Sequence, residues 1–278
     1  MFTLNCKGKL VSLDKPLVMG IINFTPDSFY GNSQHKSTDD ALQTAEKMLT
    51  DGASFIDIGG QSTKPNAIKI TQDEELKRVL PTIEAIHQKF PEAIISIDTF
   101  YAQVAKEAVQ AGASLVNDVS AGNLDINMIK TVATLNVPYV CMHMPGTPQT
   151  MQQETNYNNI IEDILLFFIN KIDTCIKAGI KDVIIDIGFG FGKTIEQNFY
   201  LLKQLQNFKI LQKPILLGVS RKSTIYKTLN TTPEHALNGT TVLNTIGLQN
   251  GANILRVHDV KEAVETIKLY EAYQQVTL

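Results

Sequence analysis

Short apolar runs recur eight times along the chain, largely without alternation between apolar and polar residues. Buried parallel strands have this pattern, because one face of the sheet meets helices and the other meets the core. The runs therefore predict eight buried strands, at residues 17–22, 55–58, 94–97, 115–117, 138–142, 183–187, 215–219 and 254–257.

Between these runs, apolar residues recur at the spacing of a helix with one buried face. In the segment 39–50, for example, Ala41, Ala45 and Met48 fall on one side. Other helices are predicted between the strands, among them 74–90, 101–111 and 160–178.

A glycine closes a predicted helix just before the next strand at four places, Gly52, Gly112, Gly179 and Gly251. A glycine in the left-handed conformation is a common helix end. Repeated helix–glycine–strand units with eight strands favour a closed α/β barrel, the (β/α)₈ TIM barrel, over an open doubly wound sheet. No linker or low-complexity segment divides the chain, so we expect a single domain over residues 1–278.

The first residues predict a β-hairpin, because apolar residues at 2–4 and 10–13 flank Lys7-Gly8-Lys9. In a barrel, we expect this N-terminal hairpin to close the bottom.

Composition narrows the class of function. The net charge of -3 and the lack of a basic stripe argue against general nucleic-acid binding. No apolar run approaches the ~18 residues of a membrane span, and the N-terminus has no signal core, so we expect a cytoplasmic protein without membrane contact. Cys6, Cys141 and Cys175 lack the spacing of metal ligands, and we expect reduced thiols.

Polar side chains stand where the predicted strands end. In a TIM barrel all carboxyl ends of strands face one mouth, so these residues would meet in space. Hydrogen bonding at a strand end explains any one of them, but explains the whole set poorly. The set comprises Asn23, Asp57, Asp98, Asn117, His143, Asp186, Arg256 and the run Ser220-Arg221-Lys222-Ser223.

Each part of this set has a functional and a structural interpretation. The adjacent cations Arg221 and Lys222 suit an anionic or electron-rich ligand, or form a basic turn in solvent. The carboxylates Asp98 and Asp186, with the amide of Asn117, suit a heterocycle that presents several N–H donors. Alternatively, the acids pair with Lys222 or Arg256 for structure only.

The segment 57–67 reads DIGGQSTKPNA. Gly59 and Gly60 allow close approach of backbone to a ligand, and Ser62 and Thr63 offer donors, so the segment is an anion-binding loop or a plain tight turn. Asp57 lies further down its strand, and we interpret it as structural.

Three further motifs exclude or favour particular chemistry. GFGFGKT (188–194) is neither a phosphate loop nor a dinucleotide fingerprint, because Ile187 occupies a position that requires glycine and the G-x-G-x-x-G spacing fails. His143 is interpreted as a structural histidine. Arg256 and His258 favour an anion site, since arginine binds pyrophosphate bidentately and stacks on flat rings.

With these residues assembled, the chain resembles the dihydropteroate synthase family over residues 17–260. This family condenses 6-hydroxymethyl-7,8-dihydropterin pyrophosphate with p-aminobenzoate, giving pyrophosphate and 7,8-dihydropteroate for folate biosynthesis. The resemblance implies a transferase that uses Mg²⁺, forms a homodimer and is a sulfonamide target. The matching motifs are MGIINFTPDSF (19–29), DIGGQSTKP (57–65), SIDT (96–99), NDVSAG (117–122), MHMPGTPQTM (142–151), GFGFGKT (188–194), GVSRKS (218–223) and RVHDV (256–260).

The resemblance also implies roles for individual residues, of which Asn23, Lys222 and Arg256 would be catalytic. The pterin would be held by Asp98, Asn117, Asp186, Lys222 and Arg256. The pyrophosphate would be held by Asn23, Thr63, Lys64, Arg256 and His258, with Asn23 also the Mg²⁺ ligand. The aminobenzoate side would be lined by Pro65, Phe191 and Ser223.

The chain departs from the family pattern at four positions. Gly31 replaces an acid in the first loop, Gln61 and Lys64 replace glutamate and arginine in the second, and Ile187 replaces a proline. Two other functions stay open. A pterin-binding methyltransferase shares the barrel but typically lacks the Ser-Arg-Lys run, and a non-catalytic pterin-binding paralogue is compatible with the altered loops.

Overall fold

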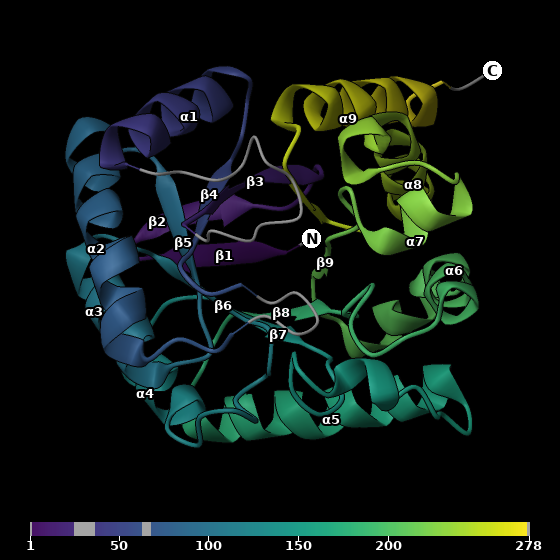
Figure 1. The fold of residues 1–278 in the computed structure, drawn as a ribbon, viewed down its shortest axis with the longest axis horizontal. Coiled ribbons are helices and arrows are strands. Elements are labelled where there is room, and N and C mark those ends of the chain that lie inside the picture. Colours follow the sequence, from purple (N-terminus) through teal and green to yellow (C-terminus); the bar gives the residue numbers. More distant parts are fainter. Residues whose placement is uncertain (1, 25–36, 63–67, 277–278) are drawn as a thin grey trace.

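A computed structural model describes residues 2–24, 37–62 and 68–276. Eight parallel strands close into a barrel in the order β10-β3-β4-β5-β6-β7-β8-β9, with helices around it (Figure 1). The predicted TIM barrel is therefore confirmed. The barrel strands are β3 (Leu17–Asn23), β4 (Phe55–Gly59), β5 (Ile94–Asp98), β6 (Leu115–Asp118), β7 (Tyr139–Met142), β8 (Val183–Asp186), β9 (Ile215–Leu217) and β10 (Ile254–Val257).

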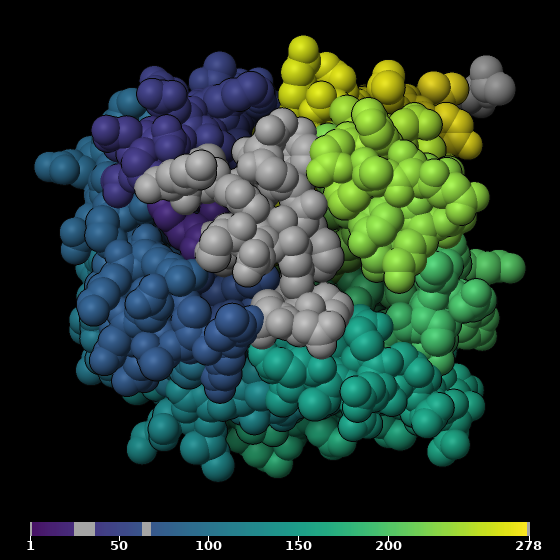
Figure 2. All heavy atoms as spheres, in the orientation of Figure 1, coloured from purple at the N-terminus to yellow at the C-terminus, as the bar shows by residue number. Residues whose placement is uncertain are grey.

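Helices follow the strands in chain order and form the outer layer. In the space-filling view, the colours run around the perimeter in the order of the sequence, as successive βα units require (Figure 2). The α-helices are α1 (Thr38–Thr50), α2 (Gln72–Lys89), α3 (Ala102–Ala111), α4 (Met128–Leu135), α5 (Ile160–Ala178), α6 (Ile195–Lys203), α7 (Ser223–Thr228), α8 (Leu237–Gln249) and α9 (Val260–Gln274). Short 3₁₀ helices are η2 (Met151–Gln153), η3 (Leu205–Leu211) and η4 (Pro233–His235).

Helix ends agree with the glycine pattern. Gly52, Gly112, Gly179 and Gly251 all have φ between 99° and 130°. Side chains with a Cβ are strained there, which explains why glycine stands at all four turns. The helix starts are shifted slightly: α2 begins at Gln72 rather than 74, because the Thr71 side chain caps it by accepting from the Glu74 amide.

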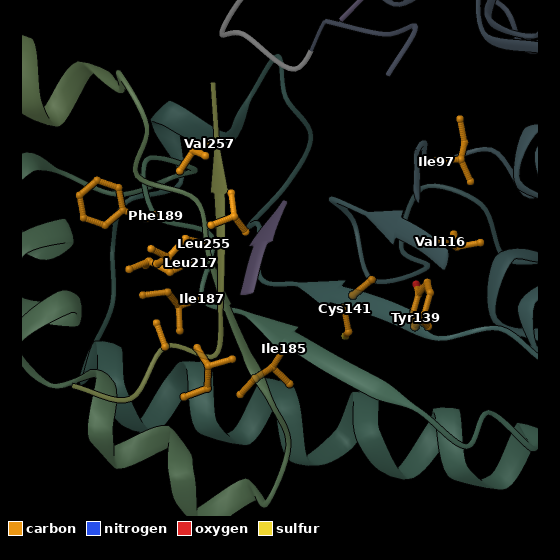
Figure 3. Packing of buried hydrophobic residues seen from close by; sticks show 14 of the residues in the cluster. Ile97, Val116, Tyr139, Cys141, Ile185, Ile187, Phe189, Leu217, Leu255 and Val257 are labelled. Atoms are coloured by element: carbon orange, nitrogen blue, oxygen red, sulfur yellow. The ribbon is translucent and has the colours of Figure 1, made fainter. Parts of the chain in front are cut away.

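Residues of each barrel strand alternate between two cores, because side chains of a strand point to opposite faces in turn. Outward residues such as Val116, Ile185, Leu217 and Leu255 belong to the cluster between sheet and helices (Figure 3). The first inward residues form a second apolar cluster that includes Met19, Phe55, Ile94, Leu115, Val140, Ile184, Leu216 and Ile254. This inward cluster fills the lower half of the barrel.

The N-terminal hairpin pairs β1 (Thr3–Cys6) with β2 (Lys9–Ser12). Its turn is Lys7-Gly8, with φ of 53° and 92°, the two positive values that a tight two-residue hairpin turn requires. Lys9 therefore lies in a strand and not in the predicted turn. Leu4 and Cys6 pack against the inward apolar cluster, so the hairpin closes the bottom of the barrel as predicted.

Two strands end earlier than the apolar runs suggest. β8 stops at Asp186 and β9 at Leu217, while Ile187 and Val219 stay fully buried beyond them. An apolar run reports burial, and in these βα loops burial continues after the ladder of hydrogen bonds has ended.

Candidate active site

The upper half of the barrel interior is polar, and strand periodicity explains why. Two residues beyond an inward apolar residue, a side chain points inward again. Asp57 follows Phe55 by this rule, and Arg256 follows Ile254. The same spacing places Asn117 above Leu115 and Asp186 above Ile184.

Arg256 is the centre of a buried ionic network. Its Nε donates to Asp57 Oδ2 at 2.6 Å and its Nη2 donates to Asp98 Oδ2 at 2.7 Å. The Arg256 side chain is only 19% exposed, and Asp57 is fully buried. Although burial opposes it, the two carboxylates raise the pKa of Arg256, so the guanidinium stays charged.

Asp57 belongs to this network, which the sequence interpretation did not foresee. Its Oδ2 also accepts from Asn117 Nδ2 at 3.0 Å, and this bond assigns the orientation of the Asn117 amide. The Asn117 oxygen is thus available as an acceptor for a ligand N–H. Asp57 orients two predicted pterin-binding residues. The sequence signal for this role is its position two residues after the inward-facing Phe55, which directs Asp57 into the barrel as well.

Asp186 and Lys222 form a second charged part of the site. Asp186 ends β8, is 5% exposed, and accepts from the Gly188 amide at 2.8 Å. Burial raises the pKa of Asp186, opposed chiefly by Lys222. Burial lowers the pKa of Lys222 to about 8, opposed chiefly by Asp186. Burial therefore disfavours the charged form of each group, and the opposite charge of the other group stabilises it.

The segment after β8 holds Lys222 in place. The Phe189 carbonyl accepts a hydrogen bond from Lys222 Nζ, and the Phe191 ring lies with its centroid 4.6 Å from the same nitrogen. Ser223 begins α7 directly after Lys222. Phe191 and Ser223, the described residues of the predicted aminobenzoate set, are both partly buried, and the Phe191 ring contacts the ammonium.

His258 is paired with Ser220. Ser220 Oγ lies 2.9 Å from His258 Nδ1 and accepts from the His258 backbone amide at 3.2 Å. If Ser220 uses its one proton toward Nδ1, the imidazole proton is on Nε2 and His258 is a donor for an anion. Burial, with Arg256 beside it, lowers the pKa of His258 to about 3, so the ring is neutral.

Arg221 does not join the neighbouring Lys222 in the site. Its φ of 52° is in the left-handed region, and its guanidinium makes a bidentate ion pair with Asp259 at 2.8 Å for both bonds. It also donates to the carbonyls of Pro233 and Glu234. Of the two adjacent cations noted in the sequence, Lys222 faces the charged cluster and Arg221 ties the end of β9 to the end of β10.

Two other polar residues also serve the scaffold. Asp118 accepts from Tyr139 Oη and from the Ser120 amide and hydroxyl, on the helix side of β6. His143 Nδ1 lies 3.1 Å from Lys193 Nζ, and its ring packs edge-on against Phe167. This agrees with the interpretation of His143 as structural.

Several predicted residues lie outside the described part of the chain. These are Thr63, Lys64 and Pro65, together with the departure at Gly31. Gln61 is described, and its amide ties two stretches together: Nε2 donates to the carbonyls of Ser62 and Ile68, and Oε1 accepts from the Ile70 amide. A glutamate could not make the two donor bonds.

A metal ion in this site would have to be held mainly by the bound substrate and water, with few protein ligands. Among the described residues, no group of three or more His, Cys, Asp or Glu side chains could hold a metal ion. Asn23 ends β3 half-buried at the mouth, where its Oδ1 lies close to Gly59. One amide oxygen fits Mg²⁺ that is bound chiefly through phosphate and water, as this ion usually is.

No helix in the described residues has the length and apolar character of a membrane span. The chain is similar to dihydropteroate synthases over nearly its full length. That of Haemophilus influenzae is 42% identical over 271 residues, covering 97% of this chain and 98% of that protein. That of Escherichia coli is 41% identical over 268 residues, covering 96% and 94%.

Solved structures agree with the sequence matches. Dihydropteroate synthase of Yersinia pestis, in a sulfonamide drug complex, superimposes with a TM-score of 0.95 at 40% identity, over 99% of this chain and 100% of that chain. The Xanthomonas albilineans enzyme with 4-aminobenzoic acid gives 0.91 at 37% identity, over 99% of both chains. The family model described as pterin binding enzyme matches residues 19–258. The chain therefore belongs to the dihydropteroate synthase family of pterin-binding enzymes.

Proposed function

We propose that this protein is a transferase that condenses 6-hydroxymethyl-7,8-dihydropterin pyrophosphate with p-aminobenzoate, giving 7,8-dihydropteroate and pyrophosphate. The observation that carries the proposal is the buried polar cluster at the barrel mouth. It brings together Asp98, Asn117, Asp186, Lys222 and Arg256. Family membership supplies the reaction, and the cluster supplies groups that suit it.

The cluster suits the edge of a pterin ring, which presents several N–H donors beside ring and carbonyl acceptors. Asp98 and Asp186 accept, and the Asn117 oxygen accepts because its nitrogen is bonded to Asp57. Lys222 donates to a ring acceptor. Hydrogen bonds to charged groups are stronger than hydrogen bonds between neutral groups, and exclusion of water from the site strengthens them further.

Arg256 would serve both ends of the first substrate. Its Nε and Nη2 are directed to Asp57 and Asp98, which fixes the plane of the guanidinium. A flat cation held in this way can stack on the pterin and attract the pyrophosphate. His258, whose ring is neutral, would bind a phosphate oxygen through a ring N–H without adding charge.

The chemistry proposed needs no covalent nucleophile. The bond between the pterin methylene carbon and the pyrophosphate oxygen breaks, and its electron pair leaves with the pyrophosphate. The amine nitrogen of p-aminobenzoate bonds to the methylene carbon and gives up one proton. The protein contributes placement of the two reactants and stabilisation of charge on the leaving group.

Mg²⁺, when bound, would neutralise part of the charge on the pyrophosphate. Asn23 would be its protein ligand, with Thr63 and Lys64 as further pyrophosphate contacts and Pro65 beside Phe191 and Ser223 on the aminobenzoate side. These roles follow from the resemblance. The homodimer is likewise a proposal, which light scattering of the purified protein tests.

A coupled assay of pyrophosphate release tests the function. We expect release only when the pterin pyrophosphate, p-aminobenzoate and Mg²⁺ are present together. Tight binding of the pterin without turnover would instead favour a non-catalytic pterin-binding protein. Absence of both binding and turnover would reject the proposed site.

A further inference from the structure

Lys193 is a buried cation that none of the proposed steps uses. It is 4% exposed. Its Nζ lies 3.0 Å from the Gly188 carbonyl, 2.8 Å from the Phe191 carbonyl and 3.1 Å from His143 Nδ1. The His143 carbonyl, at 3.4 Å, is a fourth acceptor. An ammonium has three hydrogens, so these acceptors from the protein use its full donor capacity. Lys193 is therefore not a ligand for phosphate.

Keeping a lysine there is costly, since burying a charge is unfavourable unless it is paired. Burial lowers the pKa of Lys193 to about 7, and the nearby Asp186 opposes the change. A methionine of similar length would avoid this cost. A local rule that is broken in this way often marks a group with a functional purpose.

The bonds of Lys193 join two chain segments. One is the segment 188–193 between β8 and α6, and the other follows β7. They pack so closely that a Cβ at Gly188 would overlap the His143 carbonyl oxygen, and a Cβ at Gly192 would overlap the Pro145 ring. Lys193 lies between them and bonds across this contact to His143. Two other side chains also bond across it: Gln152 Nε2 donates to the Gly190 carbonyl, and Tyr157 Oη donates to the Gly192 carbonyl.

The opposite side of segment 188–193 contacts Lys222. The Phe189 carbonyl accepts from Lys222 Nζ, and a Cβ at Gly190 would lie 3.0 Å from Lys222 Cδ. The Phe189 ring is fully buried in the cluster that contains Leu217 (Figure 3). The segment thus has Lys193 bonded on one side and Lys222 on the other, through carbonyls only two residues apart.

We propose that Lys193 is a positioning residue for pterin binding, which holds segment 188–193 so that the Phe189 carbonyl and the Phe191 ring keep the Lys222 ammonium at the pterin edge. This inference rests on the proposed pterin pocket. It adds a residue that acts through Lys222 and touches no substrate.

A double-mutant cycle tests this dependence. Affinity for the pterin pyrophosphate is measured by calorimetry without p-aminobenzoate, in wild type, Lys193→Met, Lys222→Met and the double variant. We expect Lys193→Met alone to weaken binding about 10-fold, as loss of one well-placed hydrogen bond would. In the Lys222→Met background, the same change should weaken binding no more than about 2-fold, because the positioned group is gone.

The matched control is Lys203→Met, at an exposed lysine of α6, which should bind the pterin like wild type. Multiplicative effects of Lys193→Met and Lys222→Met would overturn the proposal, and so would unchanged affinity in Lys193→Met. If circular dichroism shows that Lys193→Met is unfolded, Lys193→Gln replaces it in the cycle under the same criteria. Unchanged affinity in Lys222→Met would reject the pterin pocket itself, which separates the two failures.

Discussion

Replacing Lys222 by methionine tests whether the site is maintained at a cost in stability. Burial lowers the pKa of Lys222 from 10.5 to about 8, although Asp186 opposes the change. The folded protein therefore holds this proton less tightly than the unfolded chain does. At 1.36 kcal/mol per pKa unit, the protonated lysine costs about 3 kcal/mol of folding free energy at neutral pH.

Lys222→Met should separate binding from stability. We expect the free energy of unfolding to rise, by at most about 3 kcal/mol. The gain will be smaller than this because the substitution also removes the positive charge that stabilises the buried Asp186 carboxylate and chiefly opposes the rise of its pKa. Pterin binding should weaken by roughly 1.5–3 kcal/mol, the usual value of a hydrogen bond to a charged group.

The pH dependence gives this prediction its sign. The folded pKa of Lys222 lies below the unfolded one, so between about pH 8 and 10.5 the unfolded chain binds more protons. The free energy of unfolding of the wild type therefore rises relative to that of Lys222→Met as pH increases through this window. Below the window, the variant keeps its full excess of stability over the wild type.

Denaturant unfolding at pH 7 and at pH 10 measures the difference, with calorimetry for pterin affinity. The exposed Lys203→Met is the control for the exchange of a lysine for methionine at the surface. A Lys222→Met protein that is less stable than wild type by the same amount at both pH values would refute the reasoning.

Two further variants address the rest of the network. Asp57→Asn keeps the shape but removes the charge that Arg256 contacts through Nε, and pterin pyrophosphate affinity measured by calorimetry should fall at least about 10-fold; affinity equal to wild type would return Asp57 to a purely structural role. Asp259→Ala removes the carboxylate that pairs bidentately with the buried Arg221 guanidinium and should lower the free energy of unfolding by about 3–5 kcal/mol; a loss under about 1 kcal/mol in denaturant unfolding would show that the other partners of Arg221 suffice.

Much of the fold could be predicted from local patterns. Apolar runs mark strands because parallel strands are buried on both faces, and a glycine after a helix marks a turn that other residues reach only under strain. Both signals depend on a few neighbouring residues. They located all eight barrel strands. Their main error was in strand ends, because residues such as Ile187 and Val219 stay buried after the strand has ended.

The site was predictable in part. Asp98 and Asp186 end their strands, Asn117 and Arg256 are the last residues but one of theirs, and the barrel brings strand ends together. Asp57 was assigned to structure because it lies deeper, although the inward direction it shares with Phe55 follows from the two-residue period. Counting inward positions from the apolar layer would have placed it in the site.

Hydrophobic periodicity and glycine positions act over short distances along the chain, so they were enough to predict the barrel and the residues that reach its mouth. Which charges are paired with which depends on contacts that exist only in the folded chain. Arg221 and Lys222 are neighbours, yet a left-handed φ at Arg221 sends one to Asp259 and the other toward Asp186. Lys193 likewise reaches His143, 50 residues earlier in the chain, only in the folded protein. A buried charge is unfavourable unless it is paired, so each buried cation depends on acceptors that lie within bonding distance in space. These distances cannot be read from the linear sequence.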